Sequence, residues 1–137
     1  MGCDIHCHVE IEVDGEWIHY SSPYIGRSYI LFEKMAGVRG DMKNAIFPPK
    51  GLPENICKTT ALDAKWWGPD GHSHSWLSED EYIKLAEWVK KERPNSPLYM
   101  SENFGYLYGN NFASFIEYRD DYPEFVQGFR IVFWFDN

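Results

Sequence analysis

The chain has 137 residues, of which 44% are hydrophobic and 18% aromatic, and its formal net charge is −8 at pH 7. This length and apolar content predict a single folded domain, residues 1–137, and exclude a largely disordered chain. The acidic charge argues against a nucleic-acid polymer as partner, and the absence of a leader sequence or a long apolar run predicts a cytoplasmic protein without a membrane partner.

Residues 3–13 alternate strictly between apolar and polar side chains, which predicts a half-buried strand. The apolar positions are Cys3, Ile5, Cys7, Val9, Ile11 and Val13, and the polar positions are Asp4, His6, His8, Glu10 and Glu12. Asp14-Gly15 is typical of a type I′ turn, so residues 17–20 are expected to return as the second strand of a hairpin.

A helix is predicted from about Ser28 to Ala36, with Gly37 as its C-cap. Residues 41–75 are expected to form a long irregular loop, because prolines and glycines cluster at 48–53. A short helix is predicted near residues 60–65 of this loop, and Trp66 and Trp67 are expected to hold the loop against the core.

The next helix, to about residue 92, begins with a capping box formed by Ser78 and Glu81. A further helix is predicted at 112–118. The run from Gly128 to the C-terminus is almost continuously apolar, which predicts an interior strand. This order of elements predicts an α+β fold with a mostly antiparallel sheet, containing the N-terminal hairpin and the C-terminal strand, and with helices packed on one face.

The polar side of the first strand carries candidate metal ligands. Neighbouring positions on one strand face are roughly 6.5–7 Å apart, so His6 can share an ion with Asp4 or with His8. Asp4 and His8 are about 13 Å apart along the strand, so all three rarely bind one metal. The remaining ligands of a metal centre must therefore come from other segments.

The segment 68–75 is the best source of such ligands, because it contains two more histidines in an expected turn. These two histidines are His72 and His74. Asp136 would approach Asp4 if the last strand ran antiparallel to the first. The predicted centre binds a divalent metal, Zn²⁺ or Mn²⁺, through a set comprising Asp4, His6, His8, His72 and Asp136. The alternative is structural: an exposed strand face whose imidazoles are only hydrogen-bonded.

Basic residues beside glycines form a second candidate site. Arg27, Arg39 and Lys50 lie next to Gly26, Gly40 and Gly51, and arginine suits bidentate binding of phosphate. Trp66 and Trp67 are the aromatic residues expected to complete a pocket for a small anionic ligand such as a nucleotide. The alternative interpretation is that these cations only form surface ion pairs and that the rings belong to the core.

Five blocks of the sequence resemble a family of small, largely uncharacterised proteins of tailed bacteriophages and prophages. The blocks are MGCDIH, YILFEKMAGVRG, FPPKGLP, HSHSWLSEDE and RIVFWFDN. The resemblance directs attention to Cys3, Asp4, His6, Arg39, His72, Ser75 and Asp136. It implies that His72 is a better candidate ligand than His74, and His6 a better one than His8. It implies no established activity, although an accessory phage protein that acts against host defence would fit it.

Three functions follow as hypotheses. The first is a metal-dependent hydrolase, a phosphodiesterase for a small nucleotide, in which metal-bound water is activated and the catalytic residues are Asp4, His6, His72 and Arg39. The second is a non-catalytic protein that sequesters a nucleotide signal, across the interface of a homo-oligomer. The third is an inhibitor whose acidic surface binds a host protein.

Overall fold

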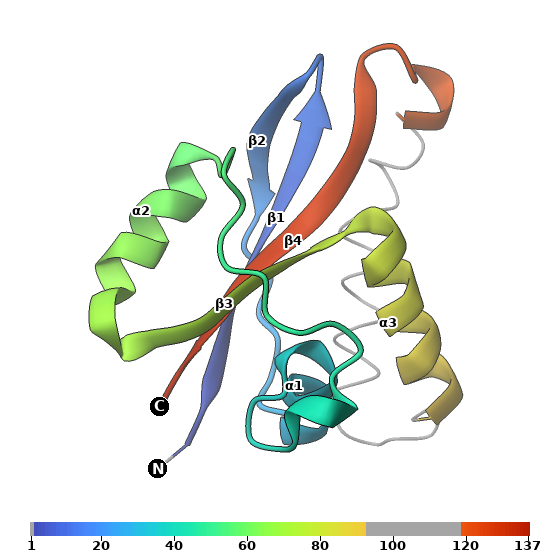
Figure 1. The fold of residues 1–137 in the computed structure, drawn as a ribbon. Coiled ribbons are helices and arrows are strands. Elements are labelled where there is room, and N and C mark those ends of the chain that lie inside the picture. The colour runs from blue at the N-terminus through green and yellow to red at the C-terminus, as the bar shows by residue number, and fades with distance from the viewer. Residues whose placement is uncertain (1, 93–118) are drawn as a thin grey trace.

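The fold is a four-stranded antiparallel sheet with helices around it, as seen in a computed structural model that describes residues 2–92 and 119–137 (Figure 1). The strands are β1 (Asp4–Val13), β2 (Glu16–Ser21), β3 (Gly71–Ser78) and β4 (Val126–Asp136), in the spatial order β2-β1-β4-β3. The α+β class is confirmed. Within the described ranges, no helix is both long and apolar enough to cross a membrane.

The N-terminal hairpin forms as predicted. Asp14 and Gly15 have φ angles of 50° and 79°, which are the two left-handed conformations of a type I′ turn. β4 lies between β1 and β3, so the prediction of an interior C-terminal strand is confirmed. Asp4 pairs with Asp136 across β1 and β4, which confirms that the two strands are antiparallel and that their ends meet.

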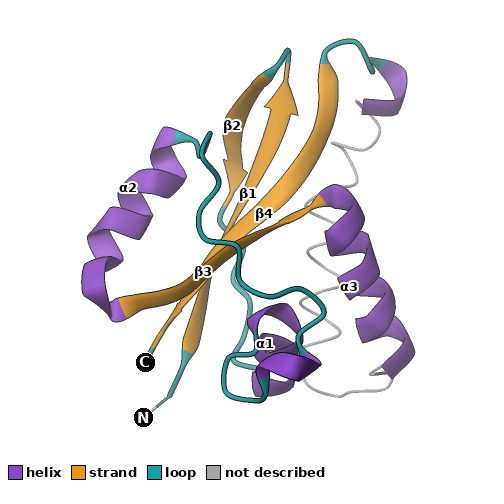
Figure 2. Cartoon of the chain, viewed as in Figure 1, coloured by secondary structure: helices purple, strands orange, loops and turns teal. Residues whose placement is uncertain are grey.

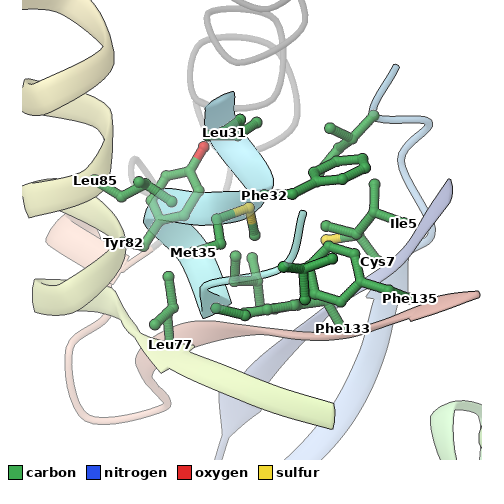
Figure 3. Packing of buried hydrophobic residues seen from close by; sticks show 14 of the residues in the cluster. Ile5, Cys7, Leu31, Phe32, Met35, Leu77, Tyr82, Leu85, Phe133 and Phe135 are labelled. Atoms are coloured by element: carbon green, nitrogen blue, oxygen red, sulfur yellow. The ribbon is translucent and has the colours of Figure 1, made fainter. Parts of the chain in front are cut away.

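One face of the sheet, the core face, carries the apolar positions of β1 and the facing positions of β4. It packs against α1 (Tyr29–Ala36) and α3 (Glu79–Glu92), and Figure 3 shows Phe133 and Phe135 beside Phe32 of α1. Cys3 and Cys7 are buried in this core, as small hydrophobic residues are. Burial raises the pKa of Cys7 to about 12.

The opposite face, the polar face, is covered by the helix α2 (Lys58–Trp67), which lies on the other side of the sheet from α1 and α3 (Figure 2). The expectation of helices on one face therefore holds for α1 and α3, and α2 adds a layer on the second face. This helix buries part of the polar side of β1: His8 is 5% exposed and Glu10 is 0% exposed. The alternative of an exposed strand face is therefore wrong for these two residues.

Helix ends follow their sequence signals. Ser28 caps α1 by accepting a hydrogen bond from Leu31 N, and Gly37 ends this helix with a φ of 72°. The capping box of α3 is present, since Ser78 N donates to Glu81 Oε1 at 3.0 Å and Glu81 N donates to Ser78 Oγ at 3.3 Å.

Replacing Ser78 with alanine is expected to destabilise the protein by about 1 kcal/mol, the usual cost of losing an N-cap side chain. Urea unfolding measures this change. Ser78→Asp serves as the control, because aspartate also accepts from the Glu81 amide and should restore most of the loss. An alanine variant as stable as the wild type would contradict the prediction.

Residues 41–75 are more regular than the predicted loop. They contain a 3-10 turn, η1 (Met42–Asn44), the helix α2 and a second 3-10 turn, η2 (Gly68–Asp70), and the strand β3 begins at Gly71. The short helix predicted near residues 60–65 is present as α2, in a stretch that contains no proline or glycine. Strand β3 forms because it pairs with the free edge of β4. The predicted helix at 112–118 lies outside the described residues.

Candidate functional site

A buried ion pair occupies the middle of the polar face. Arg130 Nε and Nη2 donate to Glu10 Oε1 at 2.8 and 2.6 Å, and Arg130 Nη1 donates to Asn55 Oδ1 at 2.7 Å. The second carboxylate oxygen of Glu10 accepts from Cys57 N at 3.1 Å, just before α2 begins. This group ties the 53–57 segment and α2 to the sheet, so we assign it a structural role.

The carboxyl group of Glu10 stays ionised despite its burial. Burial acts to raise its pKa, but hydrogen bonds with Cys57, Thr60 and Arg130 together outweigh burial, and the pKa is lowered. Such a carboxylate stabilises the folded state at neutral pH and loses this contribution in acid.

A chain of hydrogen bonds lies beside this ion pair, between β1, β2 and α2. His8 Nε2 is 2.7 Å from Asp63 Oδ2 in α2. His8 Nδ1 is 3.0 Å from Ser22 Oγ and 3.0 Å from His19 Nε2. Burial, followed by the proximity of His8, lowers the pKa of His19, which favours its neutral form. His8 is therefore fully engaged by these neighbours.

His6 lies further along the polar face, towards the chain termini. Its ring stacks on Trp67 with centroids 4.0 Å apart, and its Nε2 atom is 3.4 Å from Asp136 Oδ1. Neither of these two atoms forms a hydrogen bond within the described part of the chain. Asp4 lies at the same end, but its carboxylate is held by Arg27 at 2.9 and 3.0 Å, and this hydrogen-bonded pairing lowers the pKa of Asp4.

His72 lies on the other side of the sheet. It pairs in register with Phe135, whereas His6 pairs with Trp134, and consecutive residues of a strand point to opposite faces. His6 and His72 therefore cannot meet at one ion. The predicted metal set is distributed over separate environments, and residues 2–92 and 119–137 contain no group of three or more His, Cys, Asp or Glu side chains arranged to hold a metal.

A hollow of about 260 Å³ opens where β3 meets the turn after α1. It is lined by Ala36, Gly37, Val38, Arg39, Met42, His72, Ser73 and Asn137. The guanidinium carbon of Arg39 lies 5.2 Å from the centre of the Tyr29 ring. The structure thus brings together Arg39 and His72, two of the four predicted catalytic residues.

Three polar side chains of the hollow, those of His72, Ser73 and Asn137, are linked by hydrogen bonds. His72 Nε2 is hydrogen-bonded to Asn137 Oδ1, and His72 Nδ1 is 3.0 Å from Ser73 Oγ. Because Asn137 Oδ1 can only accept, the His72 proton is on Nε2 and Ser73 donates to Nδ1. The carboxamide nitrogen of Asn137 is a further N–H donor group among the residues that line the hollow.

The other predicted ligand-binding residues lie elsewhere. Lys50 forms an ion pair with Glu81 at 2.6 Å, and its Nζ atom makes a cation–π contact 3.6 Å from the centre of the Trp76 ring. Trp66 is 82% exposed on α2, so the prediction that it holds the loop against the core was wrong. Trp67 stacks on His6 instead of lining the hollow.

Several residues of these sites were not among the sequence predictions. Ser73 and Asn137 line the hollow, and Asp63, Ser22 and His19 surround His8. The position of His19 could have been inferred from the sequence, because residues two apart on the predicted return strand, such as Trp17 and His19, lie on the same face. Asp63 had none, because no pattern in the sequence places α2 over β1.

No protein-family model, no curated protein and no solved structure matches this chain.

Proposed function

We propose that the protein binds a small anionic ligand carrying a phosphate group, in the hollow between Arg39 and Ser73. Of the two functions that use a small molecule, binding and metal-dependent hydrolysis, the geometry supports binding better. Binding requires only the groups that the hollow assembles, whereas the expected metal ligands are divided between the two faces of the sheet.

The observation that carries this proposal is the backbone of the hollow. Three non-glycine residues of the described chain have positive φ, and one of them, Asp14, belongs to the hairpin turn. The other two, Arg39 and Ser73 with φ angles of 60° and 56°, both line the hollow. Non-glycine residues in this region are disfavoured, and such positions gather at ligand-binding and active sites.

The chemistry of the lining suits an anion. Arg39 carries a positively charged fork of N–H donors, and Asn137 offers a second donor type. Val38 and Met42 supply an apolar wall. A volume of about 260 Å³ is slightly below the roughly 300–1,000 Å³ of pockets for drug-sized ligands, which favours a compact ligand.

Substitution of Arg39 by glutamine is expected to weaken phosphate binding at least tenfold, because a hydrogen bond to a charged group contributes about 1.5–3 kcal/mol. The measurement is an NMR titration of wild type and variant with inorganic phosphate and with AMP, at constant ionic strength. Lys43→Gln is the matched control: it removes the same charge from a side chain that is 79% exposed and outside the hollow.

The proposal fails if neither ligand shifts the resonances of Gly37, Ser73 and Asn137, or if Arg39→Gln binds as tightly as Lys43→Gln. Comparison of AMP with phosphate decides whether the nucleoside adds affinity. Neither Trp66 nor Trp67 lines the hollow, so no stacking surface for a base is part of this proposal.

The resemblance to bacteriophage proteins extends the proposal. A phage protein with this site would withhold a phosphate-bearing nucleotide signal from the defence of the infected cell. This extension comes from the resemblance alone, and a shift on AMP addition that exceeds the shift on phosphate addition would support it.

A further inference from the structure

A second polar site lies on the opposite face of the sheet from the hollow, and it contains a hydroxyl, an imidazole and a carboxylate in series. The three groups come from separate parts of the chain: Ser22 follows β2, His8 is in β1, and Asp63 is in α2. Two hydrogen bonds link them. Ser22 Oγ is 3.0 Å from His8 Nδ1, and His8 Nε2 is 2.7 Å from Asp63 Oδ2.

The proton positions follow from the partners. An ionised carboxylate only accepts, so the proton of neutral His8 is on Nε2 and is donated to Asp63. His8 Nδ1 is then an acceptor that faces the Ser22 hydroxyl. This is the arrangement of a nucleophile, a general base and a group that orients the base, although the two imidazole nitrogens have exchanged the roles they have in serine proteases.

The surroundings fit these roles. His8 is 5% exposed, and its ring stacks on Trp134 with centroids 5.3 Å apart, so its orientation is fixed. Ser22, by contrast, is an exposed residue that directly follows β2.

We propose that Ser22 is a nucleophile that attacks small activated esters, with His8 as its general base and Asp63 as the residue that positions His8. Ser22 Oγ forms a bond to the acyl carbon while its proton passes to His8 Nδ1. The ester bond breaks, and the departing alcohol takes that proton. Water then attacks the acyl-serine with the same proton transfers and releases the carboxylic acid.

His19 defines the competing arrangement. Its Nε2 atom is 3.0 Å from both Ser22 Oγ and His8 Nδ1. If a proton on His19 Nε2 is donated to Ser22 Oγ, the hydroxyl stays free to donate to His8. If it is donated to His8 Nδ1 instead, the base is occupied and Ser22 is as unreactive as any surface serine. The two arrangements predict different reactivity, which a chemical probe measures.

The test uses a fluorophosphonate, which labels an activated serine by forming an Oγ–P bond with loss of fluoride. Full-length protein is incubated with the probe, and the label is located by peptide mass spectrometry. We expect a single labelled site at Ser22, no label there in Ser22→Ala, and labelling about 100-fold slower or more in Asp63→Asn, in line with the usual contribution of general-base catalysis.

The controls separate a reactive site from a structural one. Asp63 has a side chain that is 36% exposed, so Asp63→Asn is expected to fold, which a thermal melt verifies. Ser21→Ala is the matched serine control, because the hydroxyl of Ser21 is buried and has no hydrogen-bond partner within the described chain. This variant should be labelled at Ser22 as fast as the wild type. A wild-type protein that is not labelled at Ser22, or labelling of Ser22 that is unchanged in Asp63→Asn, would overturn the proposal. Neither result affects the phosphate site, which is tested by a different ligand on the other face.

Discussion

Replacing Glu10 with alanine is expected to destabilise the protein by about 3–5 kcal/mol, the usual cost of removing one partner from a buried ion pair. Glu10 is 0% exposed and Arg130 is 3% exposed, so the guanidinium would be left charged and without its carboxylate in a space that water does not reach. The variant would also lose the acceptor for Cys57 N, which fixes the start of α2. Urea unfolding of wild type and variant measures the change in free energy.

A double variant shows whether the loss comes from the stranded charge. Glu10→Leu with Arg130→Met replaces both partners by apolar side chains and is expected to cost less than either single substitution, because no charge is left unpaired. Costs that simply add would indicate that the two residues act independently. That result would contradict the assignment of a coupled pair.

The same pair predicts how stability depends on pH. The pKa of Glu10 is lower in the folded state than its ordinary value of about 4.3. The stabilisation is therefore fully present above that ordinary value and is lost as the pH falls through the lower, folded-state pKa. The unfolding free energy of Glu10→Gln should consequently change less than that of the wild type as the pH is lowered below about 4.

Replacing Trp134 with alanine is the second substitution with a large expected effect, about 3–5 kcal/mol. Trp134 is 0% exposed near the C-terminal end of β4, and its ring stacks on His8 and on His74 with centroids 5.3 and 5.8 Å apart. Its removal would leave a cavity between the sheet and α2. The orientation of His8 would be lost with it, so labelling of Ser22 should fall in this variant as well.

Two matched variants test whether packing of the ring is the cause. Trp66→Ala removes the same side chain from a position that is 82% exposed, and it is expected to change stability by no more than about 0.5 kcal/mol. Trp134→Phe keeps most of the ring and removes an indole N–H that has no hydrogen-bond partner in the described chain, so it should retain most of the stability. Similar losses in Trp66→Ala and Trp134→Ala would contradict this explanation.

Local signals in the sequence were sufficient for most of the strands and helix ends. The period of two in residues 3–13 identifies which side chains of β1 share a face, and Asp14-Gly15 predicts the turn because few other residues adopt its two positive φ angles. The capping box at Ser78 and the glycine at the end of α1 act within a few residues, so they too can be read directly. Strand β3 could not be predicted in this way, because its formation depends on pairing with β4, which is more than 50 residues away in the chain.

The polar sites were likewise predictable only in part. Alternation is a property of the extended backbone, so the sequence alone places Asp4, His6, His8 and Glu10 on one side of β1. The neighbours that cover this side follow from long-range packing, in which α2 brings Asp63 to His8 and the 53–57 segment brings Cys57 N to Glu10. Pairing with β4 likewise places His72 on the opposite face, through a shift of register in β3. Periodicity assigns a side chain to a face, whereas its partners are set by the packing of distant segments, which no local pattern encodes.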